Sequence, residues 1–118
     1  MLSDHLIQRR YCRYRVDQPV AALQYWDESR TRTIEGRCHS ISERGLGARF
    51  SDQLRIGEMV LIQVRPGLRV YAVVRNLSGF DHGLEFVLMR GTQRQAMAEL
   101  CRSHAERERG VYDLEYDA

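Results

Sequence analysis

The stretch GEMVLIQVRPGLRVYAVVRNL, residues 57–77, decides the fold class of this chain. Its first part, 57–64, contains the unbroken apolar run Met59-Val60-Leu61-Ile62, which predicts a strand covered on both sides. Pro66-Gly67 predicts a tight turn. The part that follows, 69–77, alternates as a half-buried strand does, with one side formed by Val70, Ala72 and Val74. The stretch therefore predicts two consecutive short strands.

The same signals recur on both sides of this stretch and predict a mainly-β chain. Four more strands are expected, at Pro19–Trp26, Thr31–Ile41, Gly45–Phe50 and Gly83–Leu88. Turn-forming residues separate several of them, as at 27–30. Six short strands at regular spacing are typical of a barrel or a sandwich.

The periodicity changes after residue 91 and predicts one C-terminal helix. Its stripe of residues at helical spacing is Ala96, Met97, Leu100, Cys101 and His104. Thr92, with Gln95 three residues later, predicts a capping box at the start. Gly110 predicts the end of the helix. The last residues, 111–118, are acidic and could form a strand, a tail or a contact surface.

Composition restricts the class of protein and of ligand. The 118 residues correspond to one domain, and the net charge of +2 argues against a general polyanion binder. All eighteen Lys and Arg positions are arginine, so each of these cations is a planar guanidinium that can bind a phosphate bidentately. No apolar run approaches the roughly 20 residues of a membrane span. The polar N-terminus predicts a cytoplasmic protein.

Cysteine and histidine spacing predicts neither a disulfide framework nor a metal site. The three cysteines are far apart, and the four histidines lack metal-ligand spacing, so we expect no cofactor. Cys38 and His39 are adjacent, and adjacent strand residues point to opposite faces, which argues against a thiolate pair. His82 and Asp81 are expected to be structural or solvated. We find no catalytic set of residues.

Two clusters carry candidate binding chemistry. In the first, Arg9-Arg10-Tyr11-Cys12-Arg13-Tyr14-Arg15, four arginines lie within seven residues just before the first strand. They could fold over a ligand or form a solvated basic arm.

The second cluster, Ser40-Ile41-Ser42-Glu43-Arg44-Gly45-Leu46-Gly47, lies at a strand-to-strand turn. Its hydroxyls and backbone amides suit phosphate and guanine edges. Gly45 could take positive φ, and Gly47 could let a ligand approach the backbone. A plain hairpin turn is the alternative.

Together the two clusters resemble the signature of the PilZ domain family, an RxxxR before the first strand and a [D/N]xSxxG turn after the second. Arg9 and Arg13 supply the RxxxR, and Ser42 and Gly45 supply the SxxG. The resemblance extends over roughly residues 8–105, through Gly57-Glu58-Met59-Val60, Val73-Val74-Arg75 and His82-Gly83-Leu84-Glu85-Phe86. It implies an all-β fold, a six-stranded antiparallel split β-barrel with a C-terminal α-helix. The arginine-rich ligand loop would occupy residues 1–15, the barrel and helix 16–107, and an acidic tail 108–118.

The resemblance also implies a function. PilZ domains are bacterial receptors for cyclic di-GMP, and the guanidinium fork matches the O6 and N7 acceptors of guanine. The implied ligand-binding residues are Arg9, Arg10, Arg13, Ser40, Ser42, Gly45 and Gly47. The N-terminal loop would close on the ligand and relay the signal to a protein partner. Ser40 stands where the family usually has Asp or Asn. This departure leaves retained, weaker, water-bridged or lost binding open.

Two alternatives to a nucleotide receptor remain from the sequence. One is a PilZ-like adaptor that has lost nucleotide binding and acts through protein contacts, which Ser40 favours. The other is a small barrel that binds single-stranded nucleic acid, which Tyr11 and Tyr14 among the arginines favour and the low net charge opposes. We expect a monomer or a weak homodimer, with no membrane span.

Overall fold

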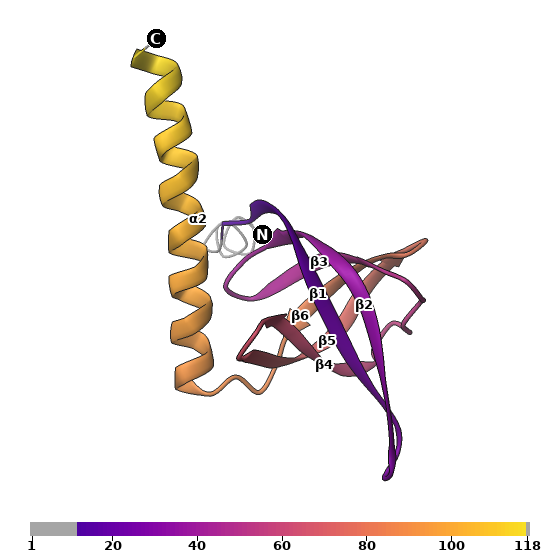
Figure 1. The fold of residues 1–118 in the computed structure, drawn as a ribbon. Coiled ribbons are helices and arrows are strands. Elements are labelled where there is room, and N and C mark those ends of the chain that lie inside the picture. Colours follow the sequence, from indigo (N-terminus) through magenta and orange to yellow (C-terminus); the bar gives the residue numbers. More distant parts are fainter. Residues whose placement is uncertain (1–11, 118) are drawn as a thin grey trace, which may run out of the picture.

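The computed structural model describes residues 12–117, without the side chains of Trp26 and residues 108–117. Six antiparallel strands close into a barrel, and one helix follows them (Figure 1). This confirms the fold that the resemblance to the PilZ family implies, and it decides between the barrel and the sandwich that the strand pattern left open. The elements are β1 (Tyr14–Asp27), β2 (Arg30–Ile41), β3 (Gly45–Phe50), β4 (Met59–Arg65), β5 (Leu68–Ser78), β6 (Asp81–Phe86) and α2 (Gly91–Asp117). Their order around the barrel is β1-β2-β3-β6-β5-β4.

The core fills the barrel with alternate side chains from all six strands. The side of β5 formed by Val70, Ala72 and Val74 is buried, as the sequence predicts. Val60, Ile62 and Val64 of β4 are buried too. The prediction that β4 is covered on both sides is wrong for the part of the chain that the structure describes. Met59 is 49% exposed and Leu61 is half-buried, because the barrel is a single layer whose outer face has no second sheet.

The hairpin of β1 and β2 is longer than the sequence suggests. β1 begins at Tyr14 rather than Pro19, so residues 14 and 15 belong to the barrel and not to a loop. Proline has no N–H to donate to a strand ladder and is tolerated where a strand edge is open. Pro19 pairs with Arg37 of β2, whereas the pairs between β1 and β4 begin only at Ala21. The proline therefore does not end the strand.

The start of α2 differs from the predicted capping box by two residues. The backbone N–H of Arg90 donates to Gln93 Oε1 at 2.6 Å, which places the cap at Arg90 rather than at Thr92. Gln93 Nε2 also donates to the carbonyl oxygen of Arg69 at 2.7 Å and so ties the helix to β5. Gln95 instead donates to Glu99 Oε1.

The predicted stripe of the helix is confirmed at its centre, but its predicted end is wrong. Met97 and Cys101 are buried, and Leu100 packs against the core. The helix runs through Gly110 to Asp117, over residues expected to form an acidic tail. A glycine inside a helix costs only about 1 kcal/mol relative to alanine, so Gly110 does not force an end.

His82 joins β6 to the segment between β3 and β4. Its side chain is buried, and Nε2 accepts the backbone N–H of Leu54 at 2.9 Å. Nδ1 lies 2.7 Å from the carbonyl oxygen of Phe80, an acceptor, so Nδ1 carries the proton. The ring also meets Phe50 edge-on at 5.1 Å. His82 is therefore structural, as expected from the sequence.

We predict that His82→Ala lowers the free energy of unfolding by about 3 kcal/mol, because it leaves a cavity and a buried N–H without an acceptor. Urea denaturation measures this change. His39→Ala is the matched control, since the His39 side chain is 53% exposed. The control should change stability by less than about 0.5 kcal/mol. Equal losses in the two variants would contradict the structural role of His82.

Candidate functional site

A cavity of about 240 Å³ lies where β1 begins and the turn between β2 and β3 bends. It is lined by Arg13, Ser42, Arg44, Gly45, Arg75, Asn76, Gly83, Leu84 and Glu85. The register explains the meeting of the two predicted clusters. Tyr14 pairs with Ile41, so the residue that precedes β1 lies beside the residue that follows β2. Arg13 and the SxxG turn therefore line one site.

The other predicted site residues are placed differently. Arg9 and Arg10 lie outside the described residues. Ser40 pairs with Arg15 on one side and Gly47 on the other, and neither Ser40 nor Gly47 lines this cavity. A Cβ at Gly47 would lie 2.6 Å from both Ser40 Oγ and His39 Cε1. The space over Gly47 is thus taken by neighbouring side chains, not left open for a ligand as the sequence suggested.

The hydroxyl of Ser42 shapes the turn itself. Ser42 is buried, and its Oγ accepts the backbone N–H groups of Arg44 and Gly45, both at 3.2 Å. It also donates to the carbonyl oxygen of Gly45 at 3.3 Å. The Ser42 N–H donates to the same oxygen at 2.9 Å. These bonds fix the bend that carries Arg44 to the cavity.

Gly45 is required for a reason other than the predicted positive φ. The glycines with positive φ in the described chain are Gly57, Gly67 and Gly79. Gly45 pairs with Glu85 of β6, and a Cβ there would collide with the carbonyl oxygen of Leu84. The glycine therefore allows a close backbone approach between β3 and β6, which forms one wall of the cavity.

Several lining residues were missed or left open by sequence reasoning, among them Arg44, Arg75 and Asn76. Arg44 lies inside the turn motif, and Arg75 and Asn76 come from β5, more than thirty residues further along the chain. A register shift between Val74 and Asn76 re-aims the end of β5, as strand irregularities do. The Asn76 side chain lies over Gly83, where a Cβ would come within 2.7 Å of its Cγ. A one-residue irregularity leaves no mark in the alternation of the sequence.

The charge of the lining suits an anion. The lining contains three arginines, Arg13, Arg44 and Arg75, and one carboxylate, that of Glu85. Arg75 Nε donates to Glu85 Oε2 at 2.8 Å, and the Arg75 side chain is still 54% exposed. The lining therefore keeps an excess of positive charge, and planar guanidinium donors match phosphate oxygens bidentately.

Two of the three thiols, those of Cys38 and Cys101, do not contribute reactive chemistry to this site. Burial raises the pKa of Cys38 to about 11, and Cys38 Sγ lies 3.3 Å from the carbonyl oxygen of Ser40. Burial likewise raises the pKa of Cys101 to about 11. Both groups are therefore protonated thiols at neutral pH. The side chains that the structure describes include no group of three or more His, Cys, Asp and Glu that could hold a metal ion.

Two further observations bear on the predicted partners. Tyr14 packs against the hydrophobic core, which removes it as an exposed platform for stacking a base. Within the part of the chain that the structure describes, α2 is too polar to cross a membrane.

Comparison with known proteins gives the family. The PilZ domain profile matches residues 7–103. The PilZ domain of YcgR from Escherichia coli with c-di-GMP is 18% identical, with a TM-score of 0.69 over 90% of this chain and 98% of that chain. The YcgR structure in complex with c-di-GMP is 17% identical, with a TM-score of 0.68 over 90% of this chain and 50% of that one.

A third solved structure is more distant. The PilZ domain of CeSA from a cellulose-synthesizing bacterium is 16% identical, with a TM-score of 0.57 over 75% of this chain and 93% of that chain. No curated protein sequence matches the chain. At these identities the solved structures establish the fold, and the profile covers most of the sequence. The chain belongs to the PilZ domain family.

Proposed function

We propose that this chain is a receptor for cyclic di-GMP, bound at the cavity between Arg13 and the Ser42–Gly45 turn. The observation that carries the proposal is the position of Arg13, which lines the same cavity as both residues of the SxxG motif. Family membership supports it, and so does the YcgR PilZ domain of the same fold, whose structure is described with c-di-GMP.

The size and charge of the cavity assign a role to each wall. A volume of about 240 Å³ is below the roughly 300–1,000 Å³ of a pocket that encloses a drug-sized ligand. One guanine or phosphate would enter, while the rest of the ligand stays at the surface. Arg13 would grip a phosphate or the O6 and N7 edge of a guanine, with Arg44 beside it. Arg9 and Arg10 would cover the exposed part.

Asn76 could replace the carboxylate or amide that the family has at position 40. Ser40 offers a short hydroxyl outside the cavity, whereas Asn76 brings a donor and an acceptor to its wall. An amide at this wall can pair with the Watson–Crick edge of a guanine. In this proposal the function of the usual Asp or Asn has moved from β2 to β5.

We predict that Asn76→Ala weakens cyclic di-GMP binding about tenfold, the effect of losing one or two hydrogen bonds to a base. Isothermal titration calorimetry measures the dissociation constant. Gln95→Ala removes a comparable amide from the exposed face of α2 and should bind like the parent. An unchanged affinity in Asn76→Ala would show that Asn76 does not read the guanine.

Ligand binding would also change the surface seen by a partner. The segment that carries Arg9 and Arg10 would close over the nucleotide and create a new surface beside the turn between β2 and β3. A protein effector that recognises the closed segment would then receive the signal.

A calorimetric titration of the parent with cyclic di-GMP is the direct test. We expect saturable heat, a thermal shift, and a stoichiometry that gives the number of nucleotides per chain. Cyclic GMP is the matched control, since it carries one base and one phosphate.

The adaptor without nucleotide binding is the second candidate, favoured because Ser42 Oγ is used within its own turn. The absence of heat and of any thermal shift would leave the adaptor as the function.

A further inference from the structure

A continuous apolar face lies on the outside of the barrel, across β1, β4 and β5. One cross-strand row contains Leu23, Leu61 and Tyr71, because Leu23 pairs with Leu61 and Leu61 pairs with Tyr71. In the next row Met59 pairs with Val73, and Tyr25 lies two residues beyond Leu23 in β1. We call these six residues the outer apolar face.

The six side chains point away from the core. Their strand neighbours Ala22, Val60, Ile62 and Ala72 are fully buried inside the barrel, and successive strand side chains alternate between faces. Tyr25 is 54% exposed and Met59 is 49% exposed, while the other four are half-buried. In Figure 1 the β1–β2 hairpin projects away from α2, which stands at the other end of the barrel. Outward strand positions facing water are normally polar, so this face is a candidate interaction surface.

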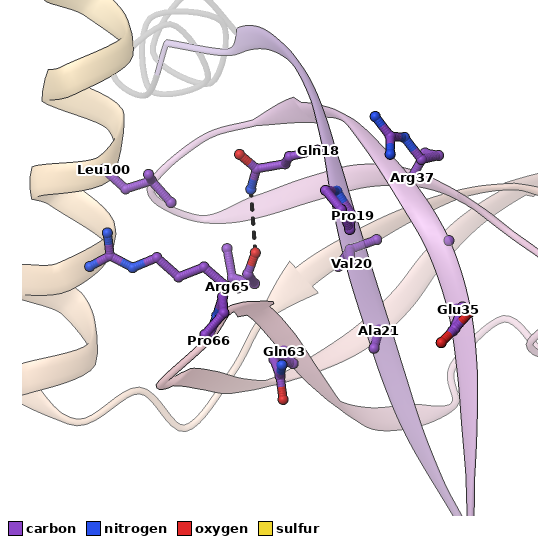
Figure 2. A pocket seen from close by; sticks show the side chains of 12 residues that line it. Gln18, Pro19, Val20, Ala21, Glu35, Arg37, Gln63, Arg65, Pro66 and Leu100 are labelled. Carbon is purple, nitrogen blue, oxygen red and sulfur yellow. Dashed lines mark hydrogen bonds between the residues drawn. The ribbon is translucent and has the colours of Figure 1, made fainter.

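Two opposite charges flank this face in the adjoining row. The register runs from Glu35 of β2 through Ala21 and Gln63 to Arg69 of β5. Glu35 and Arg69 are exposed, and among the side chains that the structure describes no ion pair joins either to an opposite charge. Beside this row lies a groove of about 560 Å³, where Glu35 and Gln63 stand on either side of Ala21 (Figure 2).

We propose that a second copy of this chain covers the outer apolar face, in a two-fold dimer whose axis follows the seam between β1 and β4. In such an interface, a residue on one side of the axis meets the residue of the second copy that corresponds to the same distance on the other side. β1 of one copy then meets β4 of the other, so that Leu23 contacts Leu61 of the second copy and Tyr25 contacts its Met59.

The same operation brings β2 of one copy against β5 of the other. Glu35 then meets Arg69 of the second copy, beside the groove. Apolar residues therefore face apolar residues and opposite charges face each other, twice over. None of these residues lines the cavity proposed for the nucleotide, so the dimer does not depend on the proposed function.

Sedimentation velocity of the full chain without nucleotide tests the proposal. We expect a reversible dimer over a concentration range of about a hundredfold, and an increase in the dimer dissociation constant of at least about thirtyfold in Met59→Asp. Phe80→Asp is the matched control: Phe80 is 41% exposed, in the turn between β5 and β6, and this variant should dimerise like the parent. A parent that stays monomeric throughout, or equal losses in both variants, would overturn the proposal.

Charge reversal tests the geometry with variants that leave the apolar residues intact. Glu35→Arg and Arg69→Glu should each weaken the dimer about tenfold, because like charges would meet. The double variant should recover to within about threefold of the parent. Circular dichroism and thermal melting establish that each variant is folded. A double variant no better than the worse single variant would refute the two-fold arrangement along this seam.

Discussion

Replacing Arg13 with alanine is expected to weaken cyclic di-GMP binding by at least about a hundredfold, with the barrel intact. Arg13 is exposed just before β1 and lines the cavity beside Ser42 and Gly45. Charge-assisted hydrogen bonds contribute roughly 1.5–3 kcal/mol each, so a bidentate contact accounts for a loss of this size. Isothermal titration calorimetry gives the dissociation constant, and thermal melting should show an unchanged midpoint without ligand.

Two further variants separate the contribution of the planar guanidinium of Arg13 from that of its positive charge. Arg13→Lys keeps a cation but loses the planar pair of donors, so it should bind with intermediate affinity. Arg30→Ala removes an exposed guanidinium from the tip of the β1–β2 hairpin, remote from the cavity, and should bind like the parent. If Arg13→Ala bound as tightly as Arg30→Ala, the nucleotide site would lie elsewhere.

The fold could be predicted because most of its signals are local. Alternating side chains in 69–77 and the turn at Pro66-Gly67 each depend on a few adjacent residues, and both predictions are confirmed. Two of the predictions that failed depend on contacts between distant segments. Pro19 lies inside β1 because β4 pairs only from Ala21 onward. The helix cap lies at Arg90 because Gln93 bonds both to it and to β5.

The site shows the same division between local and distant information. Arg13, Ser42 and Gly45 could be proposed from short motifs, and the register brings them to one cavity. Asn76 could not be proposed from a short motif, because it reaches the cavity through a register shift at the end of β5. The apolar run at Met59-Val60-Leu61-Ile62 predicted a strand covered on both sides. Its outer half belongs to the face for which we propose a second copy as the cover.

Gly45→Ala should lower the free energy of unfolding by about 3 kcal/mol, the upper part of the range for forcing extra atoms into a packed interior. The added Cβ would collide with the carbonyl oxygen of Leu84 and lie 3.3 Å from the Cα of Glu85. These are backbone atoms of β6 and cannot rotate away. Relief requires β3 and β6 to separate, which strains the bond from Phe86 N–H to the Arg44 carbonyl oxygen at 2.8 Å. Urea denaturation measures the loss.

Gly91→Ala is the matched control, because a Cβ at Gly91 meets no atom within 4 Å and its φ is not positive. At the start of α2 this change should leave stability unchanged or raise it by up to about 1 kcal/mol. The pair of variants also separates two functions of the motif glycine. If Gly45 serves only the contact between strands, the folded fraction of Gly45→Ala should bind the nucleotide like the parent. Its apparent affinity then falls only by the fraction of protein that is unfolded. A Gly45→Ala protein as stable as the parent that fails to bind would instead place the ligand directly against the backbone of residue 45.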